Sequence, residues 1–314
     1  MEASQELAGE SRCEGSEHHR AMSRRNNAIL IFAALSLIWG STWYFIKVGL
    51  NYFSPFLFAG VRFLIAGGLL TGILFLTGRK FPRNVRTWKY MFFSSFLQIT
   101  FPYAGVFWGE QFISSGLSAV LNASIPLFVA LLAHFTLVQE RLTPKKIFGF
   151  CISFLGILII FKNDLGGSAA AIMGGLAIIG SSISAACANV YAKHQGAALD
   201  PMVTVAIQLS CGGIVLTAVS LAVEHEARWH WTGESAVALL FLSIFGSLLA
   251  FIGLYWLIKH IDVTIASMLS FITPIVALAI GTITLGEKIG VHTLFGIACI
   301  FGGIYFVTGK KRKN

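Results

Sequence analysis

Two similar stretches indicate the fold of this chain: residues 121–141 read LNASIPLFVALLAHFTLVQER, and residues 269–288 read LSFITPIVALAIGTITLGEK. Each stretch holds a proline within an apolar run and ends on a glutamate followed by a basic residue. In both, glycines stand nine and sixteen residues beyond that glutamate. Because a repeat constrains the whole architecture, we interpret the match as an internal duplication.

The duplication extends toward the N-terminal side of both stretches. The matched landmarks are Trp108 and Pro126 against Trp256 and Pro274, eighteen residues apart, and Lys47 and Pro55 against Lys193 and Pro201, eight residues apart. The one departure is a gap of fourteen residues between proline and glutamate in the first copy and thirteen in the second. The two copies therefore follow one plan along most of their length.

The composition places this chain in a membrane. Only 12% of its 314 residues are charged and 56% are hydrophobic, whereas about 25% charged residues is usual in soluble domains. The mean hydropathy of +0.76 excludes both a soluble globule and a disordered chain. Five cysteines without a CxxC pair exclude a disulfide scaffold. A polytopic membrane protein remains.

Apolar runs long enough to cross a bilayer predict an all-α fold of ten transmembrane helices, because each crossing needs roughly 20 apolar residues. The predicted spans are 28–46, 55–77, 89–110, 116–138, 144–162, 171–192, 201–223, 235–258, 262–284 and 291–308. The first repeat then covers residues 28–162 and the second 171–308. The remaining ends, 1–26 and 309–314, are expected to be a disordered tail and a short basic tail.

Basic residues set the orientation of the predicted spans. Most of the 23 Lys and Arg residues fall in alternate connections, on the side that also holds both chain ends. Since cytoplasmic loops retain positive charge, we expect both termini in the cytoplasm of a bacterial-type inner membrane. Five spans per repeat is an odd number, so the second repeat enters the membrane from the opposite side. Inverted repeats of this kind are typical of secondary transporters.

Short motifs add a family resemblance. They comprise Trp39-Gly40-Ser41 with Lys47 in the first span, Pro55 and Arg62 in the second, and the proline-then-glutamate pattern in the fourth and ninth. On these residues the chain resembles the drug/metabolite transporter superfamily, specifically EamA-type permeases with two five-helix repeats. The resemblance implies transport without ATP hydrolysis, often export of amino acids or other small metabolites. It also implies a central cavity lined mainly by helices 1, 3, 4, 6, 8 and 9.

Polar and aromatic residues inside the spans are candidates for binding a small-molecule substrate. With Arg62, they are Trp39, Ser41, Thr42, Trp43, Gln98, Tyr103, Asn122, Asn189, Tyr255, Ser270 and Thr273. A small-molecule site needs a mostly apolar wall with a few polar groups that fix orientation. The alternative for each is packing, because such side chains also hydrogen-bond between helices or populate interfacial belts.

Three charged or titratable residues within the spans are further candidates. Arg62 has a fork of donors suited to a substrate carboxylate, or it pairs structurally with Glu110 or extends its charged end toward the interface. Glu110 and His134 are candidates for proton coupling, with an interfacial role and a packing role as their alternatives. Pro126 and Pro274 are predicted to interrupt their helices beside the cavity.

Other functions find little support in the sequence. The chain has no HExxH, GxSxG or Gly-x-Gly-Asp motif and no cluster of carboxylates, so an intramembrane enzyme lacks its catalytic groups. No Walker A loop is present for a primary pump. A receptor or scaffold without turnover is the other alternative. We therefore expect a transporter without cofactor, metal or nucleic acid, acting in the lipid bilayer as a monomer or a weak homodimer.

Overall fold

A computed structural model describes residues 2–113, 115–137, 143–160, 168–195, 200–285 and 291–308. These residues form helices and connections, and none of them belongs to a strand. An isolated β-bridge joins Phe53 to Trp229. The predicted all-α class is confirmed.

Helices of the first repeat coincide with the first five predicted spans. The first two are α1 (Glu2–Leu50) and α2 (Pro55–Leu76). The third span comprises α3 (Val85–Ser95), the π-helix η1 (Phe96–Thr100) and α4 (Phe101–Gly109); the fourth comprises α5 (Ser115–Asn122) and α6 (Ile125–Thr136); the fifth is α7 (Pro144–Ile160).

The second repeat has the same division. Its elements are α8 (Ala169–Gln195), α9 (Pro201–Val223), then α10 (Gly233–Ser243), η2 (Ile244–Leu249) and α11 (Ala250–His260), then α12 (Val263–Ser267) and α13 (Leu269–Leu285), and finally α14 (Val291–Thr308). A π-helix therefore divides the third span of each repeat, and a break divides the fourth.

Several of these segments are long and apolar enough to cross a membrane. Within the described residues there are 6: Asn26–Leu50, Pro55–Leu76, Ala169–Lys193, Pro201–Val223, Gly233–His260 and Val263–Ile280. Shorter apolar helices cover Ile125–Thr136 and Leu294–Gly303. The chain is a multi-pass helical membrane protein.

The starts of α2 and α9 show how local sequence positions equivalent helices. Each begins with a proline, whose missing N–H costs nothing in the first turn. The Asp200 side chain accepts a hydrogen bond from Met202 N at 2.9 Å and so caps α9. The carboxylate of Glu224, which follows α9, accepts bonds from the backbone nitrogens of the first turn of α2 at 2.9 and 3.1 Å. The end of one repeat helix thus caps the start of its counterpart.

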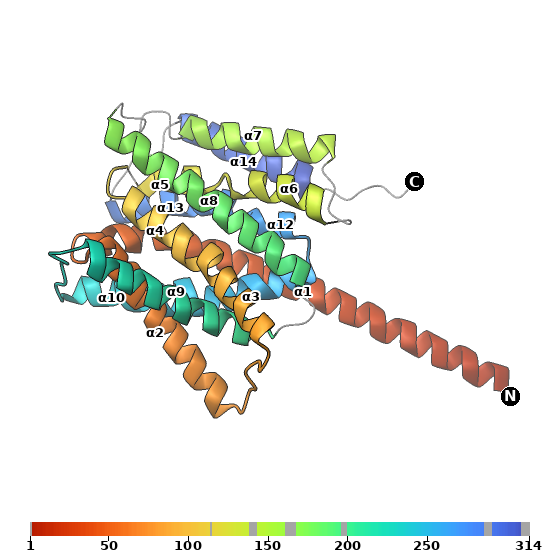
Figure 1. The fold of residues 1–314 in the computed structure, drawn as a ribbon. Coiled ribbons are helices and arrows are strands. Elements are labelled where there is room, and N and C mark those ends of the chain that lie inside the picture. The colour runs from red at the N-terminus through yellow and green to blue at the C-terminus, as the bar shows by residue number, and fades with distance from the viewer. Residues whose placement is uncertain are drawn as a thin grey trace.

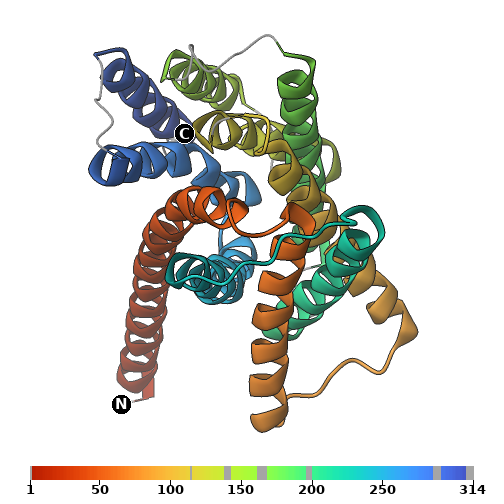
Figure 2. The same ribbon diagram turned by 90° about the vertical axis from the view of Figure 1, so that its left-hand side faces the viewer.

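Equivalent helices of the two repeats pack against each other in opposite directions. Gly60 of α2 lies against Thr217 of α9, while Gly67, farther along α2, lies against Ser210, earlier in α9. The same reversal occurs between α7 and α14, where Gly156 of α7 lies against Gly296 while Gly149, earlier in α7, lies against Gly303, farther along α14. The α2–α9 and α7–α14 pairs lie at opposite edges of the bundle (Figures 1 and 2). The repeats are therefore inverted.

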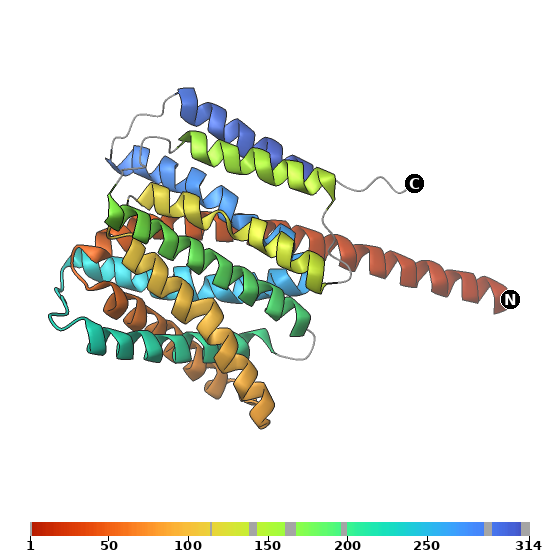
Figure 3. The ribbon, with the colours of Figure 1, turned by 45° about the horizontal axis from the view of Figure 1, so that its top comes forward.

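The beginning of the chain differs from our expectation. Residues 2–26, predicted to be disordered, continue α1 as helix out of the bundle (Figure 1). This segment contains no proline, and extending an existing helix is much easier than starting one. The start of α1 and the end of α14 lie toward the same side of the molecule (Figure 3). Residues 309–314 lie outside the described residues, as do Glu140 and Glu287.

The helix breaks are not equivalent in position. Pro126 stands in the first turn of α6, directly after the turn at residues 123–124. Pro274 instead lies inside α13, and the break comes earlier, at Met268. Pro274 has no N–H for the carbonyl of Ser270, and the Thr273 hydroxyl donates to that carbonyl at 3.2 Å. This bond lets the helix continue through the proline.

Candidate substrate cavity

A cavity lies between the two repeats, with an open volume of about 780 Å³ that includes space continuous with solvent. Its walls come from α1, η1, α4, α5 and α6 of the first repeat and α8, α11, α12 and α13 of the second. These elements make up the first, third, fourth, sixth, eighth and ninth predicted spans. They are the helices that the family resemblance implies.

Most of the predicted binding residues line this cavity. They are Trp39, Thr42, Trp43, Gln98, Tyr103, Asn122, Asn189, Ser270 and Thr273. The rest of the wall is formed by Ile46, Pro102, Val106, Ile125, Ala185, Phe251, Leu254, Ala266, Ser267 and Leu269. No acidic or basic side chain is among these wall residues, so polar recognition falls to amides and hydroxyls.

Aromatic rings meet at the wall from both repeats. Phe251 contacts Trp39 edge to face with ring centroids 5.9 Å apart, and Tyr103 at 6.2 Å. The Trp39 indole Nε1 donates to the carbonyl of Gly246 at 3.2 Å. That carbonyl lies in η2, where the wider turn disturbs the regular helix bonds. The ring of Trp39 is thus held in place by the π-helix of the other repeat.

The corresponding π-helix in the first repeat carries Gln98 to the wall. Here the hydroxyl of Ser184, from α8, donates to the carbonyl of Leu97 at 2.9 Å. Each π-helix therefore receives a hydrogen bond from a side chain of the opposite repeat. Gln98 of η1 and Asn189 of α8 both line the cavity.

Arg62 does not line the cavity, contrary to our prediction. It extends from α2, which contributes no wall residue, and is 1% exposed. Its Nε and Nη2 atoms donate to the Ser247 hydroxyl oxygen at 3.1 and 3.0 Å, and its guanidinium lies 5.1 Å from the Tyr103 ring centroid. The alternative pairing with Glu110 is not formed. The guanidinium sits behind the wall formed by Tyr103.

Two other predicted binding residues also miss the wall. The Ser41 hydroxyl donates to the carbonyl of Ile38 at 2.8 Å, and its neighbour Thr42 does the same toward Trp39 at 2.7 Å. Successive helical residues face different directions, and only Thr42 reaches the cavity. Tyr255 is buried without lining it.

The two proton-coupling candidates occupy different environments. Glu110 is fully buried, and its carboxylate oxygens have no hydrogen-bond partner among the described residues. His134 lies in the last turn of α6 on an exposed face, with its ring 5.1 Å from that of Phe135. Neither is a wall residue.

Phe251 is the main wall residue that our sequence reasoning missed. It precedes Trp256 by five residues, as Tyr103 precedes Trp108. Since Tyr103 was already a candidate, aligning the two repeats would have identified Phe251 as its counterpart. Apolar positions such as Ile125 and Leu254 give no comparable signal, because buried apolar residues occur on every helix.

An inverted pair of helical repeats around a central cavity is the architecture of a membrane transporter. The sequence pattern of the EamA-like transporter family matches residues 26–162 and 172–309. The chain belongs to this family, which agrees with the resemblance to the drug/metabolite transporter superfamily. Each match covers one of the two repeats.

Curated relatives carry transporter names. The uncharacterized transporter YoaV of Bacillus subtilis is 31% identical over 277 residues, which is 88% of this chain and 94% of YoaV. The uncharacterized inner membrane transporter YedA of Escherichia coli K12 is 29% identical over 276 residues, 88% of each chain. One crystal structure aligns with this chain over 90% of this chain and 96% of the other chain, with 19% sequence identity and a TM-score of 0.76. This last match supports the fold.

Proposed function

We propose that this protein is a secondary transporter that exports amino acids or other small amphipathic metabolites across the inner membrane. The observation that carries the proposal is the cavity, which both inverted repeats build from aromatic, amide and hydroxyl side chains. A mostly apolar wall with a few polar groups suits a small amphipathic molecule. Rocking of one repeat against the other would open the cavity to each side in turn.

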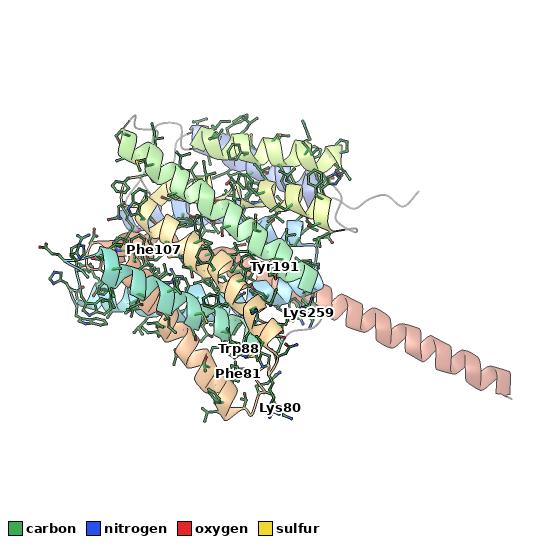
Figure 4. The ribbon with its side chains drawn as sticks, viewed as in Figure 1. Lys80, Phe81, Trp88, Phe107, Tyr191 and Lys259 are labelled. Atoms are coloured by element: carbon green, nitrogen blue, oxygen red, sulfur yellow. The ribbon has the colours of Figure 1, made fainter. Side chains whose placement is uncertain are left out.

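The proposed topology has ten crossings and both termini in the cytoplasm. The start of α1 and the end of α14 lie on the same side of the bundle, which supports an even number of crossings (Figure 3). Lys80 and Lys259 lie toward that side as well (Figure 4). Retention of positive charge makes this the cytoplasmic side in the proposal.

Substrate contacts in the proposal come from the wall residues. Gln98, Asn122 and Asn189 offer amide donors and acceptors, and Trp39 and Tyr103 offer rings. Arg62 acts from behind the wall, as a positive charge that favours an anionic group in the cavity. Proton coupling is assigned to Glu110 rather than to His134, because Glu110 is the buried group.

Uptake into proteoliposomes tests the proposal. The purified chain is supplied with a pool of labelled amino acids, nucleosides, amines and organic acids, with and without a proton gradient. We expect accumulation or counterflow of at least one compound. Replacing Asn189 by leucine removes its amide from the wall and should slow this transport about tenfold, since hydrogen bonds to a ligand contribute about 1 kcal/mol or more.

Ser41 and Thr42 provide a matched control. Both hydroxyls bond a carbonyl three residues earlier in α1, so Ser41→Ala and Thr42→Ala remove the same local bond. Only Thr42 lines the cavity, and only Thr42→Ala should slow transport. Equal losses in both variants would contradict the placement of the cavity, and a folded wild type that moves no compound in the pool would contradict the proposed function.

A further inference from the structure

Two repeat-equivalent lysines tie helix ends together at opposite ends of the bundle. Lys47, near the end of α1, donates to the backbone carbonyl of Glu110 at the end of α4, at 3.3 Å. Lys193, near the end of α8, donates to the carbonyls of Ile258 and Ile261 at the end of α11, both at 2.7 Å. Cations are favoured at helix C-termini, where carbonyls lack partners.

The symmetry of these contacts can be followed in the sequence. Glu110 follows Trp108 by two residues, and Ile258 follows Trp256 by two. The two ties therefore use the same positions in each repeat. Figure 4 places Phe107, just before Glu110, and Lys259, next to Ile258, toward opposite ends of the bundle. Because α1, α4, α8 and α11 all line the cavity, each tie joins two cavity helices at one end.

The two ties differ chemically in one respect. The first repeat has a carboxylate at the tied helix end, Glu110, where the second repeat has the apolar Ile258. Glu110 is 0% exposed and its carboxylate oxygens accept no hydrogen bond among the described residues. An ionised carboxylate in such a site is costly unless a cation faces it.

Lys47 is the cation that faces Glu110. Its ammonium donates to the backbone carbonyl of Glu110 itself at 3.3 Å, which brings this positive charge beside the residue that carries the buried carboxylate. No ion pair of 4.0 Å or less joins the two side chains among the described residues, so any attraction between them acts over a longer distance. Of the elements packed against α4, α2 brings Arg62, whose guanidinium is separated from this end by the Phe107 ring, 5.6 Å from its centroid. On α8 the residues near this end are Gly174 and Ile178, and η1 carries no titratable side chain.

We propose that Glu110 is a proton-binding site that controls closure of the cavity at the end where α1 meets α4, and that the contact made by Lys193 at the opposite end does not respond to this proton. The inference deepens the proposed transport function and rests on it. With Glu110 ionised, its charge holds Lys47 and the two helix ends together. Protonation leaves Lys47 with one hydrogen bond of 3.3 Å, at the long limit for such bonds, and this end opens. At the opposite end the two 2.7 Å bonds of Lys193 go to carbonyls on either side of His260, whose Nδ1 lies 2.7 Å from the carbonyl of Trp256. These bonds involve no carboxylate and, in the proposal, do not depend on the proton of Glu110.

Distances between spin labels test this directly. Labels are placed at Asn51, just beyond α1, and Gln111, just beyond Glu110, both exposed, in the full chain with its native cysteines replaced and reconstituted in lipid. The pH is lowered from about 8 to about 5, a range in which buried carboxyl groups titrate. We expect the ratio of short to long distances to fall about tenfold, equivalent to about 1.4 kcal/mol.

Variants of Glu110 and Lys47 test whether these two side chains cause the change in distance with pH. Glu110→Gln imitates the neutral carboxyl group and should show the long distance at both pH values. Lys47→Met should do the same, while Lys47→Arg keeps the charge and should keep the response. Lys193→Met is the matched control and should titrate as the wild type does.

Two results would overturn the inference. One is a distance that does not change with pH in the wild type, and the other is a pH response that persists in Glu110→Gln. Circular dichroism and a single elution peak establish that each variant is folded. Since no substrate is needed, these results would leave the proposed transport function standing, whereas failure of uptake would not alter the distances.

Discussion

Arg62 supports a quantitative prediction about a buried charge in this bundle. Its guanidinium is 1% exposed, donates to the Ser247 hydroxyl oxygen, and lies over three aromatic rings at 4.7 to 5.6 Å. No carboxylate forms an ion pair with it among the described residues. Arg62→Met removes the charge and keeps an unbranched side chain that fills most of the space.

The partners of Arg62 are the Ser247 hydroxyl and, at 3.5 Å from Nη2, the carbonyl of Gly246, and both remain bonded after this substitution. Ser247 donates its hydroxyl to the carbonyl of Leu242 at 2.8 Å, and the Gly246 carbonyl still accepts from Trp39 at 3.2 Å. The free energy of unfolding then falls by about 1.5–3 kcal/mol for each charge-assisted hydrogen bond that is lost. It rises by several kcal/mol because an unneutralised charge no longer has to be buried. The two effects nearly cancel, so Arg62→Met should change the free energy of unfolding by about 1 kcal/mol or less.

Arg62→Ala is the informative comparison. It removes the same charge but leaves an unfilled space, which costs about 2–5 kcal/mol for large buried side chains. Unfolding titrations with dodecyl sulfate in mixed micelles measure both variants beside the wild type. A loss in Arg62→Met as large as that in Arg62→Ala would refute this reasoning, because it would show that the hydrogen bonds of the guanidinium outweigh its desolvation.

Two further predictions concern packing and titration. A Cβ at Gly67 would lie 2.6 Å from the Ser210 backbone nitrogen, while a Cβ at Gly68 meets nothing within 4 Å. Gly67→Ala should therefore lower the free energy of unfolding by about 1–3 kcal/mol, whereas Gly68→Ala should leave it unchanged or raise it by up to about 1 kcal/mol. The same unfolding titrations measure both variants. A larger loss in Gly68→Ala than in Gly67→Ala would contradict the close approach of α2 and α9. The Tyr52 hydroxyl donates to the Glu234 carboxylate at 2.8 Å, which raises the pKa of Tyr52 above its ordinary value of 10.0, so this contact stabilises the fold below that pH and is lost as the pH rises through the raised pKa. Absorbance titration of tyrosine ionisation measures this pKa, with Tyr52→Phe identifying which part of the signal comes from Tyr52. In Glu234→Gln the pKa of Tyr52 should return toward its ordinary value, and an unchanged pKa would exclude the carboxylate as the cause.

The repeat made the architecture predictable from the sequence. Spacing of prolines, tryptophans and glycines fixed which helices correspond, and the structure places a helix or a run of helices at each predicted span. The disordered tail was not confirmed, because composition indicates whether a segment can form a core but not whether an adjacent helix will extend into it.

The helices that line the cavity could be predicted from the sequence better than the individual residues that line it. Polarity inside a span shows that a side chain needs a partner, but not whether that partner is a substrate or another helix. Thr42 and Ser41 are equally polar neighbours, and only the rotation of α1 separates them. Arg62 was misplaced for the same reason, since its partner Ser247 lies 185 positions away in the chain. The break expected at Pro274 is absent because the Thr273 hydroxyl satisfies the carbonyl that the proline leaves free.

The π-helices η1 and η2 carry a consequence for how this protein tolerates changes in length. A π-turn holds one residue more than an α-turn, so each segment behaves as a one-residue insertion within its span. Deleting one residue between Phe96 and Thr100 would therefore restore regular α-helix and leave Tyr103 in nearly the same orientation relative to the start of α3. Deleting one residue from α3 or α4 outside η1 would instead rotate the residues on its two sides by about 100° relative to each other. Such a deletion in α3 would turn the rings and amides beyond it away from the cavity although no wall residue had been replaced.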